Sequence, residues 1–477
     1  MLKKGFVSVL MAFLLILIVP KESSAEPVDF TGGIKNEYTY EEYVFITGSP
    51  IKFTASGKDI KVTVSESNGK RIESYNMKLK EAKSGATITR NFTYTYDISD
   101  YMRIGQSTFT GEVTKYSEKM TIGTTKVELV DYQFSNSAVT DNRPASDYSS
   151  GNVNIRKTYK LTNAGGTTAE VNVYADGQYY GYENFWGSTK TQLMNYEYIY
   201  WNGETGVVSS TVSHSKSKLL NYEPNLPSLS SFDGGYSVNS EADTISEYSY
   251  QLPNGINKVS LKADYMPRIE RLIVPKFRDL SSHWAKENIE KLYSLGIFDD
   301  QSNFFSPNTP MMRYDFAVAI GKALDLRVEV LETKKNSPVL KTIFKDVKRT
   351  TDGYEYLMTT YDKGVINGTT ATTFEPRGVL TRQQAATIIV RALGLEGKAP
   401  DPGFATDFKD DNKIQNYARD SVYVANELGI MIGSDGYFNP NRTLTRAESA
   451  AIIERFLRYL ENDLKQNYRD DILFFEY

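Results

Sequence analysis

Three arginines in the C-terminal part of the chain have a side chain and a setting suited to binding an anion. Arg313, Arg382 and Arg446 recur at nearly equal spacing, and a capping box would place the arginine at the first position of a helix. A cation beside the positive end of a helix dipole is unfavourable by roughly 0.3–1 kcal/mol. Its repetition therefore favours a function in which a guanidinium and free backbone N–H groups face one anion. The alternative is a salt bridge to a nearby carboxylate, and the sequence leaves both open.

The residues around these arginines form a unit that occurs three times. Each copy opens with Phe-x-Asp, whose carboxylate is the alternative partner of the arginine. A predicted helix follows and ends in Gly-Ile or Gly-Val, where glycine suits the left-handed residue that ends a helix. Phe-x-Pro, the arginine and a second apolar helix come next. The copies begin at Phe277-Arg278-Asp279, Phe344-Lys345-Asp346 and Phe408-Lys409-Asp410.

Local signals predict where the helices of the unit begin. Thr445 followed by Glu448 reads as a capping box at the start of a helix. In the first copy, Ser282 is a candidate N-cap of the first helix. Thr309-Pro310 favours a second helix that begins a few residues before Arg313. The unit is therefore expected to fold as helix, turn, loop and helix.

The combined pattern resembles the S-layer homology (SLH) domain. Phe-x-Asp, His283-Trp284-Ala285, Gly-Ile, Phe-x-Pro and Thr-Arg-Ala-Glu carry the resemblance, in three tandem copies from Phe277 to about Leu460. The resemblance implies an all-α, pseudo-threefold helical bundle. Its grooves, between adjacent copies, would hold bacterial cell-wall polysaccharide, which often carries a pyruvate ketal. The pyruvyl carboxylate would then be the anion that the arginines bind.

The resemblance also implies which residues contact the glycan. Gly368 and Gly433 would allow close backbone approach, whereas the first copy has Asp300 at the corresponding position. The second and third copies lack the His-Trp-Ala run, so we expect fewer than three competent grooves, with Arg313 the least suited arginine. Taken alone, Trp284 would more often belong to a core. The implied contact residues are Arg446, Arg382, Arg313, Asp279, Trp284, Asp346, Asp410, Gly368, Gly433 and Glu448.

Composition excludes several classes of function. The 477 residues carry a net charge of −4 and a pI near 5.6, which argues against nucleic acid as a partner. The absence of cysteine excludes disulfides, a thiol nucleophile and thiolate metal sites.

Residues 1–25 are predicted to be a secretory signal peptide. A basic pair, Lys3-Lys4, precedes an apolar run from Phe6 to Val19, and Ser23-Ser24-Ala25 is a suitable cleavage site. The run is short for a membrane span, which needs roughly 20 residues; an uncleaved anchor is the alternative. We expect a protein secreted to the cell wall or S-layer of a bacterium, without membrane contact after cleavage.

The following 240 or so residues are predicted to be all-β and antiparallel. Segments 60–64 and 86–96 alternate between apolar and polar residues, as half-buried strands do. We interpret the region as two sandwich-like domains, 26–123 and 124–263. Turns are predicted at Asn68-Gly69, Asp176-Gly177, Asn202-Gly203 and Asn254-Gly255.

A tyrosine-rich stretch, 174–201, allows two interpretations. Its aromatic rings could stack on sugars, or they could pack a sheet core. The pattern favours the core.

Catalysis receives little support. The only histidines are His214 and His283, and no serine has the glycines of a nucleophile elbow. Asp407, Asp410 and Asp411 do not match the spacing of a calcium loop. We therefore expect no enzymatic activity, no metal and no cofactor.

The predicted organisation continues with a linker, 264–276, three repeats and a C-terminal tail, 461–477. The repeats span 277–326, 344–395 and 408–460. The function predicted is noncovalent anchoring of a secreted protein to cell-wall polysaccharide, with display of the β region. One alternative is a wall-anchored polysaccharide or peptidoglycan hydrolase whose β region is catalytic. Another is self-association into a lattice.

Overall fold

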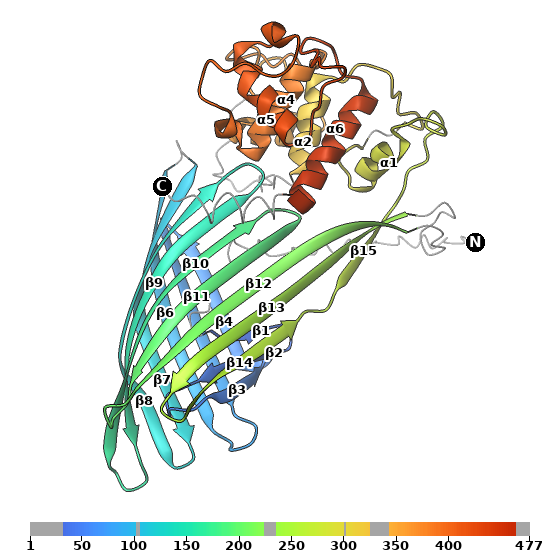
Figure 1. Ribbon diagram of the computed structural model, residues 1–477. Helices are drawn as coiled ribbons and strands as arrows, with labels where there is room; N and C mark the ends of the chain where they lie inside the picture. Colours follow the sequence, from blue (N-terminus) through green and yellow to red (C-terminus); the bar gives the residue numbers. More distant parts are fainter. Residues whose placement is uncertain (1–31, 102–104, 224–234, 300–301, 325–342, 464–477) are drawn as a thin grey trace, which may run out of the picture.

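The computed structural model describes residues 32–101, 105–223, 235–299, 302–324 and 343–463. Predictions for the signal peptide and for the tail beyond residue 463 lie outside these residues. Figure 1 shows a long sheet with a group of helices at one end.

The N-terminal region forms one antiparallel sheet of 15 strands among the described residues. Neighbouring strands are mostly consecutive in the chain, except that β3 and β4 both pair with β5, and β14 and β15 both pair with β13. The strands are β1 Ile34–Lys35, β2 Thr39–Val44, β3 Ile51–Ser56, β4 Ile60–Ser67, β5 Lys70–Lys80, β6 Thr87–Tyr101, β7 Gln106–Ile122, β8 Thr125–Asn142, β9 Asp147–Thr162, β10 Thr168–Glu183, β11 Gly187–Ile199, β12 Thr205–Glu223, β13 Gly235–Leu252, β14 Gly255–Asp264 and β15 Arg268–Leu272.

Alternating burial makes one face of this sheet its core. In β8, Val127 and Leu129 are buried while their neighbours are exposed. A bulge between Leu129 and Asp131 then adds one residue, so that Tyr132 and Phe134 also point inward. The bulge keeps the apolar side chains of a very long strand on one face.

The sheet curls until its first strand lies beside its last strands, a shape called here the rolled sheet (residues 34–272). Side chains join the two edges: Asn36 Nδ2 donates to the carbonyl of Asp264 over 3.2 Å, and the Tyr265 hydroxyl donates to the carbonyl of Lys35 over 2.6 Å. The buried apolar residues inside the roll form a single cluster.

The prediction of two sandwich-like domains is wrong. The proposed boundary at 123/124 is a tight turn in which Gly123 has a φ of 58°, and β7 and β8 pair on both sides of it. Alternation tells which face of a strand is buried, but both a sandwich and a roll bury one face. The curl of the sheet decides between them, and no local pattern encodes it.

Other local predictions have mixed outcomes. The turns at Asn68-Gly69 and Asn202-Gly203 are confirmed, whereas the turn predicted at Asn254-Gly255 lies one residue earlier, at Pro253-Asn254, and Gly255 begins β14. Asp176-Gly177 instead lies inside β10, where a Cβ on Gly177 would come within 2.1 Å of the Met194 sulfur, so the glycine makes room for a neighbouring strand. Part of the predicted linker is also a strand, because β15 extends the edge of β13 next to β14.

The C-terminal region is helical. Its helices are α1 Lys286–Ser294, α2 Arg313–Ala323, α3 Tyr354–Asp362, α4 Arg382–Leu393, α5 Arg419–Glu427 and α6 Arg446–Arg458. Short 3-10 turns lie at Gly57–Asp59 in the sheet and at Glu396–Lys398, Asp411–Lys413 and Asn416–Ala418 here, and a π-helical turn, Tyr459–Asp463, follows α6. The helices pack α2 on α3, α4 on α5 and α6 on α1, so the second helix of each repeat contacts the first helix of another repeat.

The predicted helix ends are mostly confirmed, whereas two predicted starts are wrong. Gly296, Gly364 and Gly429, which follow the first helices, all have positive φ angles. The capping box of α6 is present. Ser282 is not an N-cap, because α1 begins at Lys286. Thr309-Pro310 does not start α2 early, because the residues before Arg313 bond to other repeats.

The helices contact the end of the rolled sheet that carries the β8–β9 and β10–β11 turns, called here the helical end. Tyr148, Tyr182 and Trp186 belong to the same buried cluster as the helices. Asn184 Nδ2 donates to the carbonyl of Leu460 over 3.1 Å. The first residues after α6 thus dock on the sheet. None of the described helices combines the length and the apolar character needed to cross a membrane.

Candidate functional site

A ring of backbone hydrogen bonds joins the three repeats. The N–H of Met311 donates to Leu444, that of Leu444 to Leu380, and that of Leu380 to Met311, over 2.8, 3.0 and 2.9 Å. All three side chains are fully buried. Each residue lies two positions before one of the arginines, so the ring fixes where the three arginine-bearing helices begin relative to one another.

Each arginine reaches from its own repeat onto the Phe-x-Pro segment of another. Its guanidinium carbon lies over the phenylalanine ring, and its Nε donates to the carbonyl of the same phenylalanine. The pairs are Arg313 with Phe374 (5.1 Å to the ring centre, 3.3 Å for the hydrogen bond), Arg382 with Phe438 (4.9 and 2.8 Å) and Arg446 with Phe305 (4.5 and 3.0 Å).

These contacts link the first repeat to the second, the second to the third and the third to the first. Arg313 and Arg382 also donate from Nη2 to a backbone carbonyl, Arg313 to Asn367 over 3.3 Å and Arg382 to Ile432 over 3.0 Å. Both acceptors are uncharged carbonyl groups, so the bonds position the guanidinium without neutralising it.

The prediction that free N–H groups of the helix face an anion is wrong. The N–H of Arg446 donates to the carbonyl of Thr309, and that of Arg382 to the carbonyl of Arg442. The N–H of Arg313 likewise donates to Gly378. Backbone carbonyls of adjoining repeats thus occupy the helix start, and the guanidinium side chains remain as candidate anion ligands.

The alternative, a salt bridge between each arginine and a Phe-x-Asp carboxylate, is also wrong. Asp410 instead accepts the N–H groups of Phe438 and Asn439, over 2.9 and 2.8 Å. Asp279 and Asp346 accept the equivalent N–H groups of their own repeats. The middle residue of each Phe-x-Pro has a positive φ, for example 58° at Asn439, and the carboxylate holds this strained turn. Contact of these aspartates with a glycan stays a prediction.

Electrostatics distinguish the three arginines. Burial lowers the pKa of Arg382, and the positive charges of Arg442 and Arg455 lower it further, against the opposing charges of Glu448 and Asp410. Burial also lowers the pKa of Arg313, which Glu375 opposes. Both groups remain positive at neutral pH, since the pKa of an arginine lies far above it.

The three arginines also differ in whether a carboxylate lies close to the guanidinium. Arg446 Nη1 lies 4.0 Å from the carboxylate of Asp315. Among the residues that the structure describes, Arg382 has no ion pair, and Arg442, which lies near it, pairs with Glu448 over 2.8 Å. The contact between the second and third repeats therefore places Arg382 near the positive charges of Arg442 and Arg455.

Sequence reasoning missed Arg442 and Arg455. A signal for Arg455 was available, because Lys322, Arg391 and Arg455 occupy the same position of successive repeats. Arg455 Nη1 donates to the carbonyl of Ile430 over 3.3 Å, and Arg391 pairs with Glu396 over 3.1 Å. Arg442 has no counterpart of this kind in the first two repeats.

The other predicted residues have visible structural roles. Glu448 accepts the N–H of Thr445 over 3.0 Å, completing the capping box, and receives Arg442. Gly368 and Gly433 pack within their own repeats: a Cβ on Gly368 would lie 2.4 Å from the carbonyl oxygen of Thr370. Whether either glycine also meets a ligand stays a prediction.

Trp284 lies on the surface. Its side chain is 65% exposed, beside His283, while the following Ala285 is fully buried. The interpretation of Trp284 as a core residue is therefore wrong. An exposed indole is available for stacking on a sugar ring.

Comparison with known proteins identifies the repeats. The S-layer homology domain model matches residues 276–317, 343–386 and 407–450, so the chain carries three tandem S-layer homology domains.

Relatives match part of the chain only. The surface-layer 125 kDa protein of Lysinibacillus sphaericus is 31% identical over 186 residues, 38% of this chain and 14% of that protein. S-layer protein EA1 of Bacillus anthracis is 28% identical over 194 residues, 40% of this chain and 21% of that protein. An endoglucanase of Bacillus sp. (strain KSM-635) is 40% identical over 122 residues, which are 25% of this chain and 12% of that protein. The chain thus spans a small part of the length of these relatives. The domains and the S-layer relatives indicate a secreted protein of the bacterial cell surface.

Proposed function

We propose that the three S-layer homology domains form a pseudo-threefold bundle that anchors this protein noncovalently to the bacterial cell wall. The ligand is an acidic secondary cell-wall polysaccharide, with a pyruvyl carboxylate as the group that the arginines bind. The rolled sheet is the part that is displayed. The cyclic contacts of the three repeats support the proposed symmetry.

The setting of Arg382 carries this proposal. Its guanidinium is fixed by two neutral carbonyls and a phenyl ring, in a groove where Arg442 and Arg455 add positive charge. A fixed cation whose charge is not cancelled attracts a carboxylate, and a guanidinium suits it geometrically. Nη1 of Arg382 makes no hydrogen bond to the described residues, so it can donate to a ligand.

The grooves are expected to differ in affinity. The groove that contains Arg382 is the most positive and should bind the polysaccharide most tightly. In the groove between the third and first repeats, Asp315 competes for Arg446, but the exposed Trp284 belongs to the first repeat and offers a ring for a sugar face.

Sedimentation with purified sacculi tests the proposal. The protein without residues 1–25 should pellet with sacculi that retain their polysaccharide and stay in the supernatant with sacculi stripped of it by hydrofluoric acid. Equal pelleting with both preparations would show that the wall is held through peptidoglycan, against the proposal.

We further infer that the chain is a binding protein and not a hydrolase. The endoglucanase relative matches only a quarter of this chain, a length that the three repeats can account for. Zymography of the whole protein on peptidoglycan and polysaccharide gels should give no lytic band. A band that persists after purification would favour the hydrolase alternative.

A further inference from the structure

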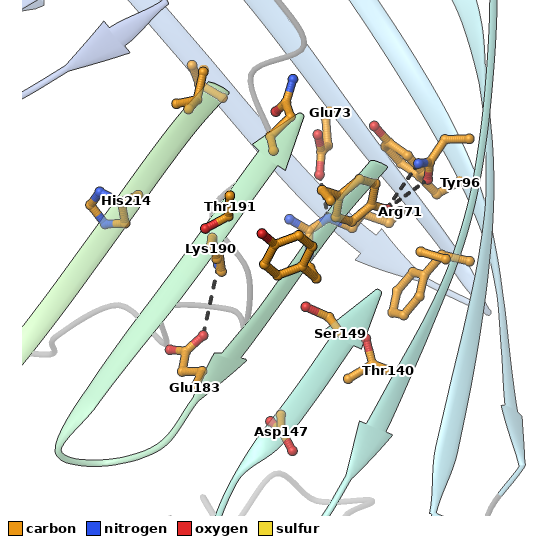
Figure 2. A pocket seen from close by; sticks show the side chains of 18 of the residues that line it. Arg71, Glu73, Tyr96, Thr140, Asp147, Ser149, Glu183, Lys190, Thr191 and His214 are labelled. Carbon is orange, nitrogen blue, oxygen red and sulfur yellow. Dashed lines mark hydrogen bonds and ion pairs between the residues drawn. The ribbon is translucent and has the colours of Figure 1, made fainter. Parts of the chain in front are cut away.

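The rolled sheet is hollow near its helical end. A cavity of about 360 Å³ lies inside it, lined by residues from β1, β2 and β4 to β13 and by Tyr265 (Figure 2). Small-molecule sites usually occupy about 300–1,000 Å³. The packed core of the roll lies deeper in the same interior, and some residues, among them Tyr96 and Tyr179, belong to the lining and also contact that core.

Aromatic rings on the cavity wall are held by glycines. The ring of Tyr179 lies where a Cβ on Gly151 would be, at 2.5 Å, and the ring of Tyr96 lies where a Cβ on Gly111 would be, at 2.4 Å. These side chains therefore pack flat against the backbone of a neighbouring strand. Asn136 Nδ2 also donates to the hydroxyl of Tyr179 over 3.0 Å. The rings are rigid surfaces that need no reordering when a ligand binds.

Polar groups inside the cavity are mostly buried. Arg71 and Glu73 form an ion pair over 2.7 Å, and the Tyr75 hydroxyl donates to the same carboxylate over 3.2 Å. Figure 2 shows this pair across the cavity from Thr191. Burial raises the pKa of Glu73, against the opposing charge of Arg71.

One buried donor is left over. The side chain of Gln192 lines the cavity, the residue is only 4% exposed, and its Nε2 has no hydrogen-bond partner among the described residues. Leaving a buried amide N–H unpaired costs roughly 1–3 kcal/mol. A ligand with a hydroxyl or carbonyl acceptor would remove this cost.

The lining excludes two classes of ligand. A hydrocarbon chain would cover Gln192 and the Arg71–Glu73 pair without bonding to them. An anion would meet an acidic wall, because the carboxylates Glu66, Glu73, Asp100, Asp147 and Glu183 outnumber the cations Lys35, Arg71 and Lys190. Rigid rings beside buried donors and acceptors suit an uncharged molecule with both apolar faces and hydroxyl groups.

We propose that this cavity binds an uncharged oligosaccharide, whose ring faces stack on tyrosines such as Tyr179 and whose oxygens accept from Gln192. The site is separate from the arginine grooves and selects the opposite kind of glycan, a neutral one. The two sites would let one molecule hold the wall through an acidic polymer and capture a neutral saccharide beside it.

Calorimetric titration with neutral probes tests the proposal. Cellotetraose and the tetramer of N-acetylglucosamine are titrated into the protein without residues 1–25, and palmitate is the competing probe. At least one oligosaccharide should bind. Gln192→Leu should weaken that binding about tenfold, and Thr140→Trp, which fills the cavity, should abolish it.

Matched controls lie on the same strands with outward-facing side chains. Leu193→Gln (40% exposed) and Val139→Trp (42% exposed) should leave binding unchanged. Thermal midpoints establish whether each variant is folded. If one of the two cavity variants does not fold, the other cavity variant and its control decide the outcome. Arg382→Ala with Arg446→Ala should also leave binding of these probes unchanged, which separates this site from wall anchoring.

Three results would overturn the proposal. The first is no heat of binding with either oligosaccharide at about millimolar concentration. The second is oligosaccharide binding that survives both Thr140→Trp and Gln192→Leu. The third is cavity-dependent binding of palmitate alone, which would assign the cavity to lipids.

Discussion

At the scale of single residues, the repeats use charged side chains to satisfy backbone groups of distant segments. The sequence predicted that Arg382 and Arg446 begin helices, but it placed the start of the first copy's second helix before Arg313. It did not predict their partners, because the arginine bonds join residues 56 to 141 positions apart. Local signals such as capping boxes carry no information about contacts of that range.

Replacing Asp410 by asparagine should destabilise the helical region. An amide oxygen cannot serve both N–H groups as a carboxylate does, so either the buried N–H of Phe438 or the partly buried N–H of Asn439 is left weakly bonded. We expect a loss of about 2–3 kcal/mol in the free energy of unfolding, measured by chemical denaturation. Asp407→Asn, at an exposed position nearby, should change it by less than about 0.5 kcal/mol. Equal effects of the two changes would contradict the role given to Asp410.

Acid should weaken the same turns in the other repeats. Burial tends to raise the pKa values of Asp279 and Asp346, but the N–H groups that they accept outweigh it, and both pKa values lie below the ordinary 3.8. A lowered pKa in the folded protein adds stability above the unfolded value, and that stability is lost as the pH falls through the folded value. The difference in stability between the wild type and Asp279→Asn with Asp346→Asn should be constant from pH 7 to about 5 and shrink below about pH 4. A difference that does not depend on pH would show that ionisation of these carboxylates is irrelevant.

At the scale of elements, the rolled sheet is stabilised by a buried network that no sequence pattern indicated. Arg90 in β6 donates from both Nη atoms to Glu42 in β2, each over 2.9 Å, and from Nε to Glu118 in β7. The Tyr159 hydroxyl donates to Glu118 over 2.7 Å. Glu42 and Arg90 belong to strands that are not neighbours in the sheet, so the network crosses the interior of the roll.

The β region was predictable strand by strand but not in its assembly. Apolar–polar alternation correctly marked the strands β4 and β6; in β6 the apolar side chains line one buried face, whereas no residue of β4 is fully buried. The network around Arg90 joins three charged residues, Glu42, Arg90 and Glu118. No pattern in the sequence distinguishes them from the other charged residues of the strands. Its existence depends on the curl that brings β2 opposite β6.

Replacing Arg90 by methionine should strongly destabilise the rolled sheet. Glu42 and Glu118 would remain buried without their cation, which typically costs 3–5 kcal/mol. Tyrosine fluorescence during urea unfolding would measure the change. Lys119→Met removes an exposed pair with Glu128 between the neighbouring strands β7 and β8 and should cost less than about 1 kcal/mol. A similar small cost for Arg90→Met would mean that the network contributes little.

At the scale of the whole molecule, the helical region and the rolled sheet share a core. Tyr182 and Trp186, at the end of β10 and in the turn after it, pack into the helical cluster, and the Tyr236 hydroxyl donates to the carbonyl of Glu287 over 3.4 Å. The sequence predicted separate domains joined by a linker and gave no sign of this junction. The junction implies that the anchor holds the roll in a defined orientation.

Trp186→Ala should loosen this junction. Removing a buried indole costs about 3–5 kcal/mol, and the loss should appear as a lower thermal midpoint for the helical region in calorimetry. Trp201→Ala is the control, because Trp201 is 53% exposed and lies in the turn between β11 and β12, away from the helices. No shift with Trp186→Ala would show that the two regions are stable independently.

The central claim is that the arginine grooves bind the acidic group of a wall polysaccharide. The most direct measurement is the affinity of the protein without residues 1–25 for sacculi, before and after mild acid removal of pyruvyl groups. The account predicts that the wild type and the exposed-site control Arg458→Ala lose at least tenfold in affinity when the pyruvyl groups are removed. Folded Arg382→Ala with Arg446→Ala should bind weakly to both preparations. Wild-type binding that is equally tight with and without pyruvyl groups would contradict the claim.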